Sequence, residues 1–241
     1  MAWSRSVKGV PCVERAALEA ANYIGIVSET NYGRLFDVRF VQKPENLADS
    51  DRGLGLHTDN PYRDPVPGFQ LLHSLIAAPE GGESLFADGF AIAGYLRETE
   101  PVLFERLAST PVTFSFRSKD AELCSEKPLI QLALRGEVRS VHYNNRSIAP
   151  LRLGSAEILP FYMAYRRFAE LLRDARFPLK IKLCGGDLVA FDNHRILHGR
   201  TGYCASTHLR HLQGCYLTRD SVLSQAALLK RSHERRTDER G

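Results

Sequence analysis

Two histidines and one aspartate have the residue types and the spacing of a metal site. His57 and Asp59 lie two positions apart, so on an extended strand both side chains point to the same face. His198 lies far downstream, at the end of an apolar strand that we expect to begin after a Gly-Gly-Asp turn at residues 185–187, and directly before Gly199. Two imidazoles and one carboxylate can occupy one face of an octahedral ion and leave three positions open, as in non-haem Fe(II) oxygenases. The sequence therefore predicts an iron site built from two distant segments.

An arginine could hold a small carboxylate beside this site. Arg210 follows His198 by 12 residues and lies in the next strand pattern. A guanidinium is a planar, permanently charged fork that holds a carboxylate in a fixed orientation. The histidine–aspartate pair, the distant histidine and the following arginine form a combination that is far rarer than any of its parts.

Two other functions remain open on the residues alone. His194 and His198 are four residues apart, a spacing that would suit a zinc hydrolase if the segment were helical. The strand-like run before them, Gly199 after them and the lack of an HExxH motif argue against a helix. A jelly-roll protein that binds a small molecule without turnover is the second alternative.

The composition is that of a folded globular protein and excludes two classes of partner. Of the 241 residues, 44% are hydrophobic and 25% are charged, which excludes a disordered or fibrous chain. The formal net charge is +4, of which the tail at residues 230–241 supplies +2 with five basic and three acidic side chains. The remaining charge is too weak and too scattered for a nucleic-acid-binding surface. No stretch of about 18 consecutive apolar residues exists, so we expect no membrane span.

Cysteine usage and the first residues favour a cytoplasmic protein. The five cysteines are an odd number and form no CxxC pair, so neither a disulfide framework nor a cysteine-rich zinc site is indicated. The N-terminal segment has no apolar stretch typical of a signal peptide. We also expect residues 232–241 to be a frayed, solvated end.

The elements that must position these residues are mainly strands. Short apolar runs bounded by Gly, Pro, Asn and Asp are typical of buried strands, and they recur at residues 69–78, 84–90, 111–116, 138–145, 179–193 and 208–218. Helical periodicity predicts helices at residues 14–26, 91–107 and 159–175. The last of these carries an apolar stripe that we expect to face the core, formed by Phe161, Tyr165, Phe168, Leu171 and Leu172. The predicted fold is a jelly-roll β-core with flanking helices.

Four longer motifs surround the candidate residues: HTDNPYRDPVPGFQLLH at 57–73, GGESLFADGF at 81–90, NHRILHGR at 193–200 and RHLQGCYLTRD at 210–220. Together they resemble the γ-butyrobetaine hydroxylase branch of the TauD-like Fe(II)/2-oxoglutarate dioxygenases. The resemblance implies a mainly β fold with flanking helices around a double-stranded β-helix (jelly-roll) core. It implies one catalytic domain over residues 1–229, followed by the charged tail at 230–241.

The resemblance also implies a role for individual residues. It assigns iron to His57, Asp59 and His198, and it assigns the distal carboxylate of 2-oxoglutarate to Arg210. Leu72 would line the cofactor pocket, and polar contacts to bound small molecules would come from Asn46 and from Asn144 or Asn145. Fe(II) and 2-oxoglutarate would then supply the chemistry, with dioxygen hydroxylating an unactivated C–H bond of a small molecule.

The substrate implied is a small polar amine or quaternary-ammonium acid, γ-butyrobetaine-like or aminophosphonate-like. Tyr32, Phe36 and Tyr216 match aromatic positions that surround a trimethylammonium group in the family, where cation–π attraction favours the cation. Two positions depart from that pattern, because Asp49 and Asn60 replace aromatic residues of close relatives and of the animal enzymes. Asp49 could hold a less methylated amine through a charged hydrogen bond, or it could be a solvated loop residue.

The resemblance bears on both ends of the chain as well. The family often carries an N-terminal zinc-binding domain and a first catalytic strand, and neither is evident here. We therefore expect either a naturally short protein or a truncated one. Relatives suggest that residues 222–229 form a dimerising helix, which would make a homodimer.

Overall fold

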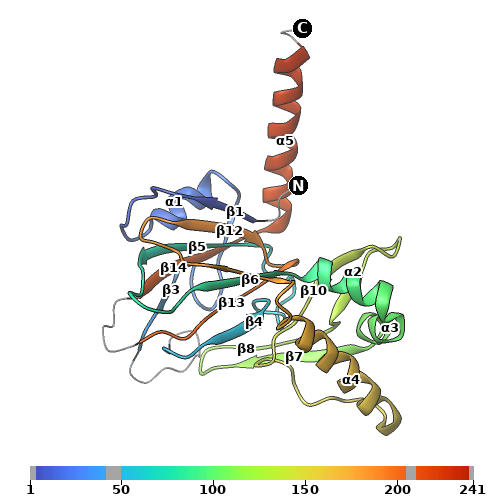
Figure 1. The fold of residues 1–241 in the computed structure, drawn as a ribbon. Helices are drawn as coiled ribbons and strands as arrows, with labels where there is room; N and C mark the ends of the chain where they lie inside the picture. Colours follow the sequence, from blue (N-terminus) through green and yellow to red (C-terminus); the bar gives the residue numbers. More distant parts are fainter. Residues whose placement is uncertain (1–3, 42–49, 205–209, 239–241) are drawn as a thin grey trace.

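The computed structural model describes residues 4–41, 50–204 and 210–238, and two antiparallel sheets form its centre (Figure 1). The first sheet has the order β1 (Ser4–Val7), β12 (Leu188–Asp192), β5 (Phe69–Ile76), β14 (His211–Leu217) and β2 (Val27–Ser28), with β3 (Phe36–Arg39) also paired to β14. The second has the order β11 (Pro178–Ile181), β6 (Ser84–Asp88), β13 (Ile196–Arg200) and β4 (Leu54–His57). Two hairpins extend beyond the sheets, β7 (Pro111–Arg117) with β8 (Glu122–Pro128) and β9 (Ile130–Leu132) with β10 (Val138–Val141).

An apolar layer between the two sheets holds them together. Leu72, Phe191 and Leu212 of the first sheet are buried in one cluster with Phe86 and Ile196 of the second. Complete burial of one such side chain stabilises the fold by about 1.5–3 kcal/mol. The two facing sheets confirm the predicted jelly-roll core.

Helices cover two sides of this core. α1 (Ala16–Asn22) lies on the outer face of the first sheet, where Ala21 packs with Leu71 and Cys215. α2 (Gly89–Thr99), α3 (Pro101–Ser109) and α4 (Ser155–Leu171) gather at the end of the molecule that holds the hairpins (Figure 1). The predicted stripe of α4 faces this second core: Phe161 and Phe168 are completely buried and Leu171 nearly so.

One predicted helix and the prediction for the C-terminal tail are wrong. The single helix expected at 91–107 is two helices, because Pro101 has no N–H to continue the first and restricts the backbone of Glu100, which leaves helical geometry. Residues 232–238 of the segment expected to be frayed are the end of α5 (Arg219–Asp238), which projects away from the sheets (Figure 1). An i,i+4 ion pair between Lys230 and Glu234 supports the helix there.

The chain crosses between the two sheets just before His198. The sequence predicts one strand that runs from the turn at 185–187 to His198, but the structure has two strands in different sheets, β12 and β13. A tight turn joins them: Asp192 accepts hydrogen bonds from the His194 N–H through its side chain (2.9 Å) and from the Arg195 N–H through its carbonyl (3.0 Å). This crossing brings His198 onto the strand next to β4.

None of the helices in the described ranges is both long and apolar enough to span a bilayer.

Candidate metal centre

Neighbouring strands bring the two histidines together. His198 on β13 and His57 on β4 are direct cross-strand partners, and their ring centroids lie 4.5 Å apart. Gly199 permits this close approach, because a Cβ atom at that position would collide with the carbonyl oxygen of Leu54 on β4. The glycine that follows His198 in the sequence therefore has a packing role in the site.

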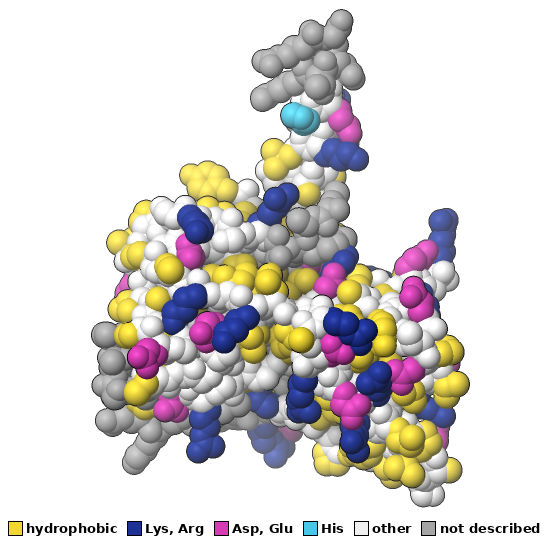
Figure 2. Space-filling model, in the orientation of Figure 1, with side chains coloured by type: hydrophobic (Ala, Val, Ile, Leu, Met, Phe, Trp, Pro, Cys, Tyr) yellow, Lys and Arg dark blue, Asp and Glu magenta, His cyan; other side chains and the backbone are white. Residues whose placement is uncertain are grey.

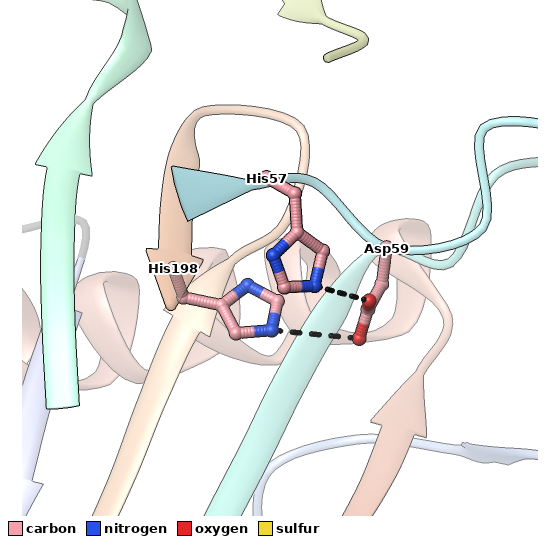
Figure 3. A group of neighbouring side chains, drawn as sticks. All are labelled: His57, Asp59 and His198. Atoms are coloured by element: carbon pink, nitrogen blue, oxygen red, sulfur yellow. Dashed lines mark ion pairs between the residues drawn. The ribbon is translucent and has the colours of Figure 1, made fainter. Parts of the chain in front are cut away.

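Asp59 completes a compact group with these histidines (Figure 3). Its Oδ1 lies 3.2 Å from His57 Nε2, and its Oδ2 lies 3.6 Å from His198 Nε2. One ligand atom from each residue lies within 4.8 Å of the other two. The predicted association of these three side chains is confirmed.

The protonation states suit a cation. Burial lowers the pKa of His198 to about 3, so this imidazole is neutral at physiological pH. Burial acts to raise the pKa of Asp59, but the imidazoles of His198 and His57 and a hydrogen bond from Tyr216 outweigh it. The pKa of Asp59 therefore lies well below its ordinary value, and the carboxylate is charged.

The donor set fits Fe(II). His57 Nδ1 lies 2.9 Å from the carbonyl oxygen of Gly55, which places the proton on Nδ1 and leaves the Nε2 lone pair directed at the group. Two imidazole nitrogens and one carboxylate form the facial ligand set. Within the described ranges the group has these three members, so a bound ion would keep positions open for a small molecule and dioxygen.

A cavity of about 620 Å³ connects this group to Arg210. Arg210 is only 5% exposed, and its Nη1 atom has no hydrogen-bond partner among the described residues. Burial, with the nearby charge of Arg200, lowers its pKa to about 10, so it still carries its charge at neutral pH. Leu72 also lines the cavity. A buried cation with a free donor fits the carboxylate of 2-oxoglutarate.

Aromatic rings form another wall of the cavity. The three predicted residues Tyr32, Phe36 and Tyr216 all line it, and the rings of Phe36 and Tyr216 lie 5.0 Å apart. Two further rings were missed by the sequence: Phe116 stacks on Tyr62 at 5.0 Å and meets Tyr32 edge-on at 6.0 Å. The strand that carries Phe116 was predicted, but its position beside the cavity depends on the tertiary fold.

Of the predicted polar contacts, two line the cavity and one lies outside it. Asn60 lines the cavity, and its Oδ1 accepts a 2.7 Å hydrogen bond from the Tyr62 hydroxyl. Asn144 also lines the cavity, but both ends of its amide bond to backbone: Nδ2 donates to Thr58 O and Oδ1 accepts from Arg146 N, both at 3.1 Å. Asn145 is exposed and accepts a hydrogen bond from a tyrosine hydroxyl outside the cavity lining.

Asn46 and Asp49 lie outside the described residues. The zinc alternative loses its geometric basis, because His194 lies in a turn and not on a helix with His198. His194 Nε2 lies 3.3 Å from the carbonyl oxygen of Val66. The pair therefore cannot act as an i,i+4 helical ligand pair.

Comparison with known proteins places this arrangement. The family model described as taurine catabolism dioxygenase TauD, TfdA family, matches residues 6–216. The γ-butyrobetaine dioxygenase of Pseudomonas sp. (strain AK-1) is 39% identical over 223 residues, which cover 92% of this chain and 58% of that protein. The human γ-butyrobetaine dioxygenase is 33% identical over 216 residues, which cover 88% of this chain and 56% of that protein. The chain thus spans somewhat more than half the length of these relatives.

Solved structures agree on the fold. An asparagine oxygenase solved with Fe(II), 3-hydroxyasparagine and succinate superposes with a TM-score of 0.69 at 16% identity, over 90% of this chain and 74% of that one. A putative α-ketoglutarate-dependent taurine dioxygenase from Burkholderia xenovorans gives a TM-score of 0.63 at 15% identity, over 85% and 74% of the two chains. With a family model that matches residues 6–216 and a jelly-roll core that joins the histidines to the aspartate, the chain belongs to the TauD, TfdA dioxygenase family.

Proposed function

We propose that this protein is an Fe(II)/2-oxoglutarate-dependent dioxygenase that hydroxylates a C–H bond of a small amine or quaternary-ammonium acid. One observation carries the proposal: the His57, Asp59 and His198 group shares a cavity with the buried guanidinium of Arg210, whose Nη1 has no hydrogen-bond partner among the described residues. An iron ligand set and a carboxylate-binding cation within one cavity are what 2-oxoglutarate requires. The named activity of the γ-butyrobetaine dioxygenases supports the reaction type.

Each residue of the site has a binding role rather than an acid–base role. His57, Asp59 and His198 would hold the iron, and Arg210 would hold the distal carboxylate of 2-oxoglutarate beside Leu72. When bound, iron and 2-oxoglutarate would supply the oxidation by dioxygen: 2-oxoglutarate would become succinate and CO₂, with one oxygen atom entering succinate and the other entering the substrate. The cavity walls orient these groups and limit access of water.

The aromatic wall supports a cationic substrate. Tyr32, Phe36 and Tyr216 present ring surfaces, which attract a quaternary ammonium group through cation–π interactions. Relatives named γ-butyrobetaine dioxygenase and trimethyllysine dioxygenase act on compounds with such a group. We propose γ-butyrobetaine-like or aminophosphonate-like acids as substrates, with Asn60 and Asn144 on the walls and Asn46 and Asp49 as further contacts.

Substrate-dependent succinate formation tests the proposal. The protein would be incubated with Fe(II), 2-oxoglutarate, dioxygen and a panel of quaternary, tertiary and primary amine acids. We expect at least one quaternary compound to stimulate succinate release. Anaerobic addition of Fe(II) and 2-oxoglutarate should also give a weak visible charge-transfer band. No band and no succinate would leave the catalytically inert jelly-roll as the better account.

We further propose one catalytic domain over residues 1–229, a homodimer, the cytoplasm as compartment and no nucleic-acid partner. α5 supports the homodimer, because Leu223, Leu228 and Leu229 on it are exposed. An odd number of cysteines without a CxxC pair supports a reducing compartment. Basic and acidic side chains are interspersed on the face drawn in Figure 2, which supports the absence of a nucleic-acid surface. Light scattering of the purified protein would test the homodimer.

A further inference from the structure

The carboxylate ligand of the metal centre lies beyond the strand that carries its histidine partner. β4 ends at His57, and Asp59 lies in the loop that follows. The two side chains point the same way only while the backbone stays extended across Thr58. In a sheet, the hydrogen bonds of neighbouring strands maintain this conformation. Another group must therefore supply those hydrogen bonds to the backbone of residues 58 and 59.

We propose that Asn193 is the positioning residue for the metal ligand Asp59 and that its side-chain amide replaces a neighbouring strand. Its Oδ1 accepts a 2.8 Å hydrogen bond from the Asp59 N–H. Its Nδ2 donates to the carbonyl oxygen of Asp59 at 3.0 Å. One amide thus binds both backbone polar groups of the ligand residue, as a paired strand would.

The other edge of the segment is held in the same manner. The Thr58 N–H donates to the carbonyl oxygen of Tyr143 at 2.8 Å, and the Asn144 amide donates to the Thr58 carbonyl oxygen at 3.1 Å. In an extended chain, successive residues direct their backbone groups to opposite sides. Thr58 is therefore fixed from one side and Asp59 from the other. Asn144 therefore holds this loop in addition to lining the cavity.

Asn193 is itself held rigidly enough to act as a reference point. It is completely buried, its N–H donates to the Gly68 carbonyl oxygen at 2.9 Å, and its Nδ2 also donates to the Pro67 carbonyl oxygen at 3.1 Å. It lies in the turn between β12 and β13, five residues before His198. The same turn therefore leads into the strand that carries His198 and holds the backbone of Asp59 in place.

Only asparagine can make this set of bonds at this length. An aspartate would keep the acceptor for the Asp59 N–H, but it would lose both donors and place a second negative charge beside two carbonyl oxygens. An alanine would leave the Asp59 backbone groups buried without partners. Both changes should disturb the orientation of Asp59 more than they disturb the sheets.

The inference rests on the metal site of the proposed function, and metal affinity tests it without turnover. Anaerobic titration with Fe(II) would be compared for wild type, Asn193→Asp, Asn193→Ala and the neighbour control Asp192→Asn. Asp192 is equally buried and pairs with Arg219, but it makes no bond to the Asp59 backbone. We expect the dissociation constant to rise at least about tenfold in both Asn193 variants and to change little in the control.

The outcomes separate the two proposals. If wild type binds no Fe(II), the proposed function fails. If wild type binds Fe(II) and the Asn193 variants bind it as tightly as the control, only the role of Asn193 is overturned. Should the variants not fold, hydrogen exchange of the metal-free wild type decides: a protected Asp59 amide supports the inference, and an amide that exchanges at the rate of a solvated loop contradicts it.

Discussion

The two ends of the cavity differ in how their polar groups are satisfied. At the metal end, the Asp59 carboxylate lies beside His57 and His198 and accepts a 2.8 Å hydrogen bond from Tyr216. At the other end, the guanidinium of Arg210 is buried with Arg200 nearby and with Nη1 unsatisfied among the described residues. The metal end is thus preorganised by the chain itself, whereas the described residues supply no anion at the Arg210 end. Substitutions at the two ends should therefore fail in different ways.

Loss of a metal ligand should have the largest effect. His57→Ala or His198→Ala leaves two ligands, which hold Fe(II) poorly, so succinate formation should fall by at least about 100-fold. The measurement is substrate-stimulated succinate release at saturating 2-oxoglutarate. His233→Ala, an exposed position on α5, is the control and should keep full activity. Near-wild-type turnover in either ligand variant would remove that residue from the site.

Substitution of Arg210 should mainly weaken binding of 2-oxoglutarate. An ammonium cannot reproduce the bidentate fork, so Arg210→Lys should raise the KM for 2-oxoglutarate by about tenfold. The affinity for Fe(II) should stay within about twofold, because the metal ligands are untouched. Initial rates against 2-oxoglutarate concentration, together with a metal titration, measure both. An unchanged KM would mean that the carboxylate binds elsewhere.

Tyr216 belongs to both the metal end and the aromatic wall, so its substitution can separate the two roles. Tyr216→Phe keeps the ring beside Phe36 but removes the hydroxyl that donates to Asp59 Oδ2. The loss of one hydrogen bond to a charged group should weaken Fe(II) binding by about tenfold and leave the substrate KM nearly unchanged. Phe36→Leu should show the opposite pattern. A substrate defect without a metal defect in Tyr216→Phe would assign its hydroxyl to the substrate instead.

A smaller effect is expected outside the cavity, where the buried His142 should make the stability of the protein depend on pH. Burial lowers the pKa of His142 well below its ordinary value, so the folded protein holds this ring neutral while the unfolded chain protonates it below about pH 6.5. The contribution of His142 to the free energy of unfolding is therefore fully present above that pH. It is lost as the pH falls below it, by up to about 1.4 kcal/mol per pH unit. Denaturant unfolding between pH 7.5 and 5 measures the loss. His142→Gln should flatten the profile, and an unchanged slope would contradict this origin.

The three candidate metal ligands could be predicted from the sequence because their residue types and local patterns point to metal chemistry. The spacing of His57 and Asp59 and the turn before His198 can be read from residue types alone. Arg210 was singled out by its position 12 residues after His198, Leu72 followed from the family resemblance, and both line the cavity. The strands at 69–78 and 111–116 were also predictable, because apolar runs between turn residues identify them.

Other features depend on contacts that no local pattern contains. β8 was missed because its residues are largely polar and its pairing with β7 leaves them half exposed. Asn193 contacts the Asp59 backbone across 134 residues of sequence, and the chain gives no sign of that pairing. The split of the predicted strand into β12 and β13 depends on which sheet each half joins. Tertiary pairing decided each of these cases.

An anaerobic crystal structure with Fe(II) and 2-oxoglutarate tests the central claim most directly. The account predicts iron bonded to His57 Nε2, His198 Nε2 and a carboxylate oxygen of Asp59, with the distal carboxylate of 2-oxoglutarate on Arg210. Iron bound elsewhere, or 2-oxoglutarate bound without contact to Arg210, would contradict it.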